Sequence, residues 1–561
     1  MLLKKKIPLF VILIPIIVFI FFLPSLSNGF VNWDDPDIFW GNPLVKNFSW
    51  SSIQHIFKVM WAGQYHRFIP LTMVLFDAEY HFFGLNPLGY HCVSVLFHSI
   101  NSLGVFVLIY FLTDKIGISV FAALLFGLHP LEIQPVIWCA ASQYPLGAFF
   151  ILSTLILYLY KLEFFAWLTY ILALLFYSQL ALPLPLLLIA IDYYYLGKIS
   201  WADIYRKIPF ILLSFYFGLM TLKSAQQTAP DYIPYFLNHH LSLIQRLNLS
   251  SEAICMYVQK FLIPYPLACF YPIKFYSHGP LFMYTGGIIF FLMVALRHQG
   301  QWRLSLLGLI WFLISLAPFL HIYGVNESII NDRYMYMAII GSLLFFIGFI
   351  GNLKEAFSKL SWPMRIILKG LLFFWIVVMV FISTQQLEVW RDSGRLWTNF
   401  IFQYPDFPDG YINRSDYYLK INQPQLALSD TDYLLNLNPN NPAAYQNRGH
   451  AYYQLRQWQA EIDAYTKVIK INPHFVKIYV DRGAAYFILG KDKNALNDFN
   501  KALELDPEEE GALYNRGRVY YYLKDYRHAL DDFNKLLVID PNYTEAKNII
   551  LEIKKILNLK E

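Results

Sequence analysis

Residues 4–37 read KKKIPLFVILIPIIVFIFFLPSLSNGFVNWDDPD, and the class of protein follows from this stretch. It joins three lysines, an apolar run from Ile7 to Leu26, and the adjacent acids Asp34 and Asp35. The run is long enough to cross a bilayer, and it lacks the small-residue cleavage site of a signal peptide. Because lysines ahead of a spanning segment favour the cytoplasm, we predict a cytoplasmic N-terminus, with the two acids at the opposite edge of the membrane.

The overall composition agrees with a membrane protein. The chain has 561 residues, of which 57% are apolar and only 15% are charged, whereas soluble domains carry about a quarter charged residues. The sequence has no basic patch interleaved with stacking aromatics, so we predict no nucleic-acid partner. Its four cysteines form neither a metal-binding spacing nor a disulfide framework.

Apolar runs recur along residues 1–385, which we predict to form an all-α polytopic membrane domain. Eleven crossings are expected, near 7–26, 89–112, 116–130, 144–160, 163–179, 181–197, 208–224, 280–297, 303–321, 334–351 and 364–384. Lysines and arginines gather in the short connections, which places these in the cytoplasm. The longer loops 27–88, 225–279 and 322–333 then lie outside, and the chain that follows the last crossing does too.

A repeat of 34 residues replaces the apolar runs beyond residue 400. Pro439, Pro473, Pro507 and Pro541 follow it, each after Asn or Asp, and an Arg-Gly pair recurs at the same interval. This period and these markers are typical of tetratricopeptide repeats, which stack helix pairs into an α-solenoid. We predict a linker over 386–405, about four repeats over 406–543, and a capping helix and tail over 544–561. Such an array is suited to binding a polypeptide.

The acidic pair is the main candidate for catalysis. Closely spaced carboxylates resist simultaneous ionisation, so one of Asp34 and Asp35 can act as a base at neutral pH. A single base suffices to transfer a sugar to a hydroxyl. Two other interpretations remain open: acids solvated at the end of a helix, and a divalent cation held by Asp35 and Asp37.

Other polar residues fall on the same predicted side. Arg67 and Arg333, from separate loops, offer forked donors for a phosphate. His66, Glu132 and Asp332 are auxiliary or acceptor-binding candidates. No nucleotide-binding glycine loop, catalytic triad order or zinc spacing is present. We therefore expect no cofactor, and an external enzyme of this kind needs a lipid-linked sugar as its donor.

Several motifs resemble the transmembrane and tetratricopeptide repeat-containing family, which belongs to the GT-C class of glycosyltransferases. They are Phe30–Asp35, Asn42–Pro43, Arg67–Thr72, Gly84–His91, Leu128–Pro130, Asp332–Tyr336 and Trp390–Ser393. The resemblance implies a GT-C fold and transfer of a sugar, mannose in eukaryotic members, from a polyprenyl phosphate to serine or threonine hydroxyls of proteins. It also implies that Asp34 or Asp35 is the base and that Arg333 neutralises the departing lipid phosphate.

The sequence departs from that family after the His-Pro motif, where many relatives carry a further His, then Glu, Val and Arg. The matching residues here are Glu132, Gln134, Val136 and Ser142. The short repeat array resembles prokaryotic relatives, so we predict a multi-pass protein of a bacterial inner membrane. Two other functions remain open: a membrane-anchored scaffold without catalysis, and a polymerase or ligase of lipid-linked polysaccharides.

Overall fold

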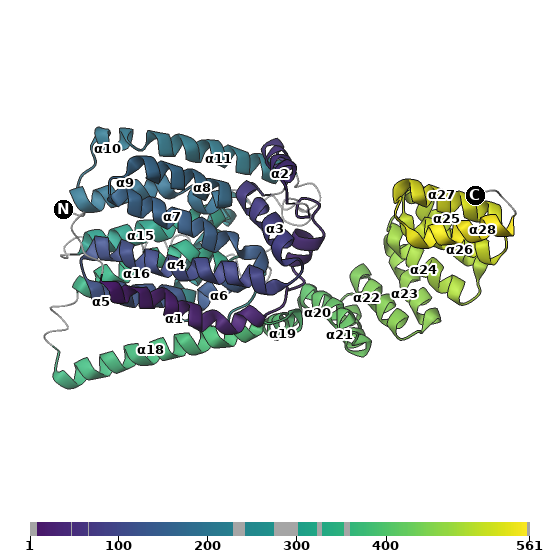
Figure 1. The fold of residues 1–561 in the computed structure, drawn as a ribbon. Coiled ribbons are helices and arrows are strands. Elements are labelled where there is room, and N and C mark those ends of the chain that lie inside the picture. The colour runs from purple at the N-terminus through teal and green to yellow at the C-terminus, as the bar shows by residue number, and fades with distance from the viewer. Residues whose placement is uncertain are drawn as a thin grey trace. The chain divides into compact units, whose positions relative to one another are not determined.

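The computed structural model describes residues 8–46, 48–65, 67–227, 242–273, 301–321, 328–352 and 360–557. The chain divides into two compact units, Met1–Leu396 and Trp397–Glu561. Both are helical, and within the described ranges the extended structure amounts to one bridge between Pro272 and Ser328. The prediction of an all-α chain is therefore confirmed (Figure 1).

Long apolar helices make up most of the first unit. They are α1 (Leu13–Phe22), α4 (Pro87–Thr113), α5 (Ile116–Leu128), α7 (Gln143–Leu159), α8 (Glu163–Ala181), α9 (Leu184–Leu196), α11 (Ile208–Gln227), α15 (Trp302–Leu316), α16 (Met335–Asn352) and α18 (Trp362–Val389). Shorter or less apolar helices are α2 (Trp50–Ala62), α3 (Pro70–Phe83), α6 (Ile133–Ile137), α10 (Trp201–Tyr205) and α13 (Leu243–Leu262).

The count of eleven crossings is not confirmed. Among the described residues, eight helical spans are long and apolar enough to cross a membrane, or nine if α5 and the bent segment Pro130–Ile137 form one span. The predicted run 181–197 is α9, which has only 13 residues because Pro183 and Pro185 lie at its start. The predicted run 280–297 and the lysines at 4–6 lie outside the described residues.

Two of these helices have large apolar surfaces that the unit does not cover. In the most apolar window of α18 only 11% of the residues are buried, and in that of α11 only 17%. Bulky side chains such as Phe373 and Phe374 on α18 are exposed. Figure 1 shows α18 and α11 along opposite edges of the helical unit. Exposed apolar surface of this extent is typical of helices that face lipid.

Close contacts between helix backbones hold the centre of the first unit. A Cβ atom on Gly308 of α15 would lie 2.6 Å from the carbonyl oxygen of Gly341 on α16, so the two helices approach closely. Polar side chains on α4 add hydrogen bonds between helices. His98 bonds the Tyr336 hydroxyl at 2.8 Å, and Asn101 donates to the carbonyl of Pro145 at 2.7 Å. This packing fixes the helix ends that carry the candidate site.

The segment between α1 and α4 contains short helices that position its polar residues. Ser49 accepts a hydrogen bond from the amide of Ser52 at 3.1 Å and so caps the start of α2. Gly63, with a φ of 77°, ends α2 in the left-handed conformation. Pro70 begins α3, where its missing N–H costs nothing. Arg67 lies in the brief connection between these two helices.

Helix pairs make up the second unit, beginning within α19 (Ser393–Gln403). They are α20 (Pro408–Lys420) and α21 (Pro424–Leu437), α22 (Pro442–Gln454) and α23 (Trp458–Ile471), α24 (Val476–Ile488) and α25 (Asp492–Leu505), and α26 (Glu510–Tyr522) and α27 (Tyr526–Ile539), followed by α28 (Thr544–Ile556).

The repeated residues explain the packing within these pairs. A Cβ on Gly483 or Gly517 would come within 2.7 Å or 2.9 Å of the facing Phe499 or Phe533 ring. Each glycine therefore leaves room for an aromatic ring between the helices.

Candidate functional site

The two adjacent acids have different surroundings. Asp35 is only 1% exposed, and its carboxylate accepts hydrogen bonds from the amides of Val31, at 2.8 Å, and Ala140, at 3.0 Å. Asp34 is partly exposed, and its Oδ2 lies 3.4 Å from Nη2 of Arg67. Asp35 therefore ties the first loop to the segment before α7, and Asp34 is the more accessible of the two acids.

Burial also changes the acidity of Asp35. Burial raises the pKa of its carboxyl from 3.8 to about 7, with a smaller contribution from the charge of Asp34. The two backbone amides oppose this shift because they bind the charged form more strongly. The pKa of Asp35 therefore lies near neutrality, but both of its oxygens are already engaged by backbone amides.

Two arginines from distant parts of the chain interact with Asp34. Burial is the largest single influence on the pKa of Arg67 and lowers it, but the carboxylate of Asp34 together with Tyr177 and Tyr65 leaves that pKa raised. Arg333 also interacts electrostatically with Asp34. The sequence analysis named both arginines without showing that they converge. The structure places Arg67 in contact with Asp34 and brings Arg333 within electrostatic range of the same side chain.

Aromatic rings hold Arg333 in place. Its guanidinium lies 5.5 Å from the centre of the Trp33 ring and 5.2 Å from that of Trp138, distances that suit cation–π attraction. Trp33 stacks on Trp138 with ring centres 4.6 Å apart and planes 7° from parallel. Nη1 of Arg333 donates to Asn331 at 3.1 Å, and the Arg333 amide donates to the side chain of Gln134 at 3.0 Å. The arginine is thus fixed before any ligand binds.

The remaining predicted site residues are not part of this cluster as described. His66 lies outside the described residues. Glu132 is fully buried, and neither of its carboxyl oxygens has a hydrogen-bond partner among the described residues. Asp332 is also buried and accepts a hydrogen bond from the Tyr271 hydroxyl at 2.9 Å. Glu132 and Asp332 are therefore buried, whereas Asp34 is partly exposed.

Among the described residues, no group of three or more His, Cys, Asp or Glu side chains is placed so that it could bind a metal ion. Within the alternative pair, both oxygens of Asp35 already accept backbone hydrogen bonds, while Asp37 is exposed. In the first loop, Asp35 thus contacts two backbone amides and Asp34 contacts an arginine.

Sequence reasoning missed two contributors to this cluster. Trp138 follows Trp33 by more than a hundred residues, and nothing in the sequence pairs them. Tyr177 interacts electrostatically with Arg67 and donates a hydrogen bond to the Tyr144 hydroxyl at 3.0 Å. It has non-helical dihedral angles inside α8 (φ −151°, ψ 87°), so the helix is kinked there. A tyrosine in an apolar run carries no signal of such a kink.

Comparisons with known proteins identify the repeats. Family models described as tetratricopeptide or TPR repeats match residues 442–475, 483–523 and 511–543. The chain therefore contains tetratricopeptide repeats. Solved structures similar to it include MamA 41-end from Desulfovibrio magneticus RS-1 (20% identity, TM-score 0.26, covering 27% of this chain and 85% of that one). Another is the Arabidopsis OM64 TPR domain (30% identity, TM-score 0.20, covering 20% and 94%).

One curated relative extends the comparison to an enzyme. Over 122 residues the chain is 29% identical to the protein O-mannosyl-transferase TMTC3 of Homo sapiens. The match covers 21% of this chain and 11% of that protein, so the chain spans about a tenth of the length of the relative. This similarity and the apolar helices together suggest a membrane protein that resembles such transferases.

Proposed function

Because tetratricopeptide repeats follow a set of apolar helices long enough to cross a membrane, we propose that the chain is an integral-membrane glycosyltransferase. It would move a hexose such as mannose from a polyprenyl phosphate to a serine or threonine hydroxyl of a protein, on the non-cytoplasmic face. The observation that carries the proposal is the partly exposed carboxylate of Asp34 beside Arg67 and Arg333. The similarity to a protein O-mannosyl-transferase supports the same chemistry.

In this proposal Asp34 is the base. The acceptor hydroxyl oxygen forms a bond to the anomeric carbon of the sugar, while the bond from that carbon to the phosphate oxygen breaks. The hydroxyl proton passes to Asp34, and the bonding electrons leave with the polyprenyl phosphate. Arg67 and Arg333 stabilise the negative charge that grows on the leaving phosphate.

The contact between Asp34 and Arg67 links donor binding to the release of the base. At 3.4 Å and partly exposed, this ion pair is weak and easily broken. A donor phosphate would compete for the Arg67 guanidinium with two or more oxygens. Once Arg67 turns to the phosphate, the Asp34 carboxylate is released from this contact and can accept the hydroxyl proton. Asp35 would act as a positioning residue that holds the loop through the hydrogen bonds it accepts from two backbone amides.

The repeats would hold the acceptor polypeptide, since arrays of this kind bind proteins. With the cytoplasmic N-terminus predicted from the sequence, the first loop lies on the outer side of a bacterial inner membrane. The eleven crossings predicted from the sequence would place the repeats on the same side. A polymerase or ligase for lipid-linked polysaccharide could use the same arginines. The protein acceptor is favoured because the curated relative is named for transfer to protein. A scaffold without catalysis is favoured only by the repeats themselves.

Intact-mass comparison of envelope proteins tests the proposal. Cells that lack the chain are complemented with wild type, with Asp34→Asn, or with Asp531→Asn, which changes an exposed acid of the repeats. We expect hexose-sized mass increments on a subset of proteins with wild type and Asp531→Asn, and their loss with Asp34→Asn. Identical masses in all strains would remove the enzymatic assignment. Loss of glycan without change in any protein would favour the polymerase or ligase.

A further inference from the structure

The turn between α18 and α19 is attached to the loop that carries the acidic pair. The last carbonyl groups of a helix have no partner within that helix. At the end of α18, the side-chain amide of Asn28 donates to the carbonyls of Leu387 and Trp390, both at 3.3 Å. Asn28 is only 3% exposed. It therefore fastens the chain just before the acids to the end of a helix that is distant in the sequence.

Two backbone amides continue this attachment along the loop. The amide of Gly29 donates to the carbonyl of Arg391 at 3.0 Å, and the amide of Asn32 donates to the hydroxyl oxygen of Ser393 at 2.9 Å. Ser393 is buried, and Asn32 comes two residues before Asp34 in the chain. The attachment therefore reaches almost to the proposed base.

The other side chains of the turn are also held. The carboxylate of Asp392 accepts a hydrogen bond from the amide of Arg395 at 2.9 Å and so caps the start of α19. The ring of Trp390 packs against that of Trp33, with centres 6.5 Å apart, and against that of Trp138, at 6.0 Å. These two tryptophans are the ones that contact the guanidinium of the candidate site. The turn therefore has a defined geometry against the rest of the site.

From these contacts we propose that the motif Trp390–Ser393 is a clamp that positions Asp34 for sugar transfer, with Ser393 and Asn28 as positioning residues. The inference rests on the proposed function, because it concerns the same base. Both side chains are buried, so they act through the backbone of the loop. Such a role matters because a base displaced by about 1 Å can slow a reaction by about a hundredfold.

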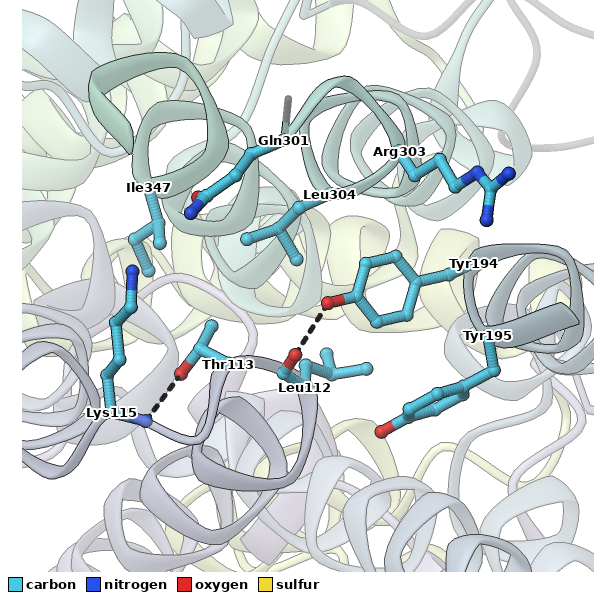
Figure 2. Close-up of a pocket in the computed structure, with 9 residues that line it drawn as sticks. All are labelled: Leu112, Thr113, Lys115, Tyr194, Tyr195, Gln301, Arg303, Leu304 and Ile347. Atoms are coloured by element: carbon cyan, nitrogen blue, oxygen red, sulfur yellow. Dashed lines mark hydrogen bonds between the residues drawn. The ribbon is translucent and has the colours of Figure 1, made fainter. Parts of the chain in front are cut away.

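A hydrogen bond at the opposite end of α4 supplies the control. The hydroxyl of Tyr194 donates to the carbonyl of Leu112 at 2.6 Å, beside a cavity of about 310 Å³ (Figure 2). His91, near the start of α4, contacts the carbonyl of Asn28 at 3.1 Å, and about 30 Å of helix separates the two contacts. Tyr194→Phe therefore removes one hydroxyl of the same unit far from the acidic pair.

Steady-state kinetics and hydrogen exchange of the full-length protein in detergent test the proposal. The substrates are polyprenyl-phosphate mannose and a synthetic polypeptide rich in serine and threonine. Ser393→Ala removes the acceptor of the Asn32 amide, whereas Ser393→Thr keeps a hydroxyl. We expect Ser393→Ala to lower kcat on the order of tenfold and to leave the donor Kd unchanged, because it leaves both arginines in place. Exchange of residues 28–35 should quicken on the order of tenfold.

Ser393→Thr and Tyr194→Phe should match the wild type in all three measurements. Undiminished kcat in Ser393→Ala, or weaker donor binding at an unchanged kcat, would overturn the proposal. Unchanged exchange of residues 28–35 in Ser393→Ala, or equal changes in Ser393→Ala and Tyr194→Phe, would overturn it too.

Two further results have a defined meaning. No transfer by the wild type would overturn the proposed function, and the positioning role with it, whereas normal transfer by both the wild type and Ser393→Ala would overturn the positioning role alone. Should Ser393→Ala fail to fold, Asn28→Asp takes its place, because it keeps the side-chain shape but removes the donor to the two carbonyls of α18 and its turn. It must then lower kcat and quicken the same exchange, and wild-type values would overturn the proposal.

Discussion

Replacing Asp35 by alanine should destabilise the first unit far more than replacing Asp34 does. Asp35→Ala leaves the buried amides of Val31 and Ala140 without their acceptor. A buried donor without a partner costs about 1–3 kcal/mol, so the two amides together cost about 2–6 kcal/mol. Asp34→Ala removes one partly exposed ion pair at 3.4 Å, which is worth less than about 1 kcal/mol.

The assay is the fraction of purified protein that stays monodisperse in detergent after heating. We expect Asp35→Ala to lower the Tm by roughly 2–7 °C, and Asp34→Ala to lower it by no more than about 1 °C. The Tm of Asp35→Asn should fall between those of the two alanine variants, because the carbonyl oxygen of asparagine can still accept one of the two hydrogen bonds from backbone amides. Equal Tm values for the two alanine variants would refute the reasoning that Asp35 holds the loop and Asp34 does not.

Three further changes test other contacts. Arg333→Lys keeps the charge but loses the planar group that stacks on the tryptophans, so donor affinity should fall on the order of tenfold in a binding assay. Burial and the charge of Asp481 raise the pKa of Glu461 from 4.5 to about 8. The contribution of Glu461 to stability is therefore fully present below about pH 4.5 and is lost as the pH rises through about 8. Glu461→Gln should flatten this part of the pH dependence in thermal melts. Arg482→Met breaks the paired hydrogen bonds to Asp498, at 2.8 Å and 2.7 Å, and should speed hydrogen exchange in α24 and α25 by at least tenfold.

Each of these predictions has a clear contrary result. Full donor affinity in the lysine variant would mean that charge alone holds the donor. A wild-type pH profile in the glutamine variant would mean that Glu461 does not carry the titration. For Arg482 the matched control is Arg448→Met, whose partner Asp432 is exposed. Equal acceleration in the two methionine variants would contradict a special role for the buried pair.

The sequence predicts the second unit well because each repeat obeys local rules. Prolines, glycines and aromatics at a fixed period determine where helices begin and how closely they pack, and the family models match residues 442–543 over nearly their whole length. One detail escapes the pattern. Arginines 414, 482 and 516 each form an ion pair with the acid sixteen residues later. The residue sixteen positions after Arg448 is Ala464, and Arg448 pairs with Asp432 instead.

The sequence predicts which residues belong to the candidate site but not how they are arranged. Residue types and predicted sides of the membrane point to Asp34, Asp35, Arg67 and Arg333. Which acid is buried depends on the amide of Ala140, more than a hundred residues away. The convergence of the arginines likewise depends on helix packing that no local pattern encodes.

The length of an apolar run also overestimates the length of its helix where a proline lies within the run. The run 181–197 has the composition of a crossing, but its helix begins only after Pro183 and is 13 residues long. The burial of Glu132 is likewise not evident from its residue type. Its charge suggests a site at the surface, whereas the bend between α5 and α6 buries it completely. In both cases backbone geometry outweighs residue type.

Transfer of labelled sugar by the purified protein tests the central claim most directly. Polyprenyl-phosphate mannose, radiolabelled in the sugar, is incubated with an acceptor polypeptide and wild-type or Asp34→Asn protein, and donor binding is measured in parallel. The account predicts that Asp34→Asn binds the donor at least as tightly as wild type does, because Arg67 is freed from Asp34, but transfers mannose at least about a hundredfold more slowly. Undiminished transfer by Asp34→Asn would contradict it.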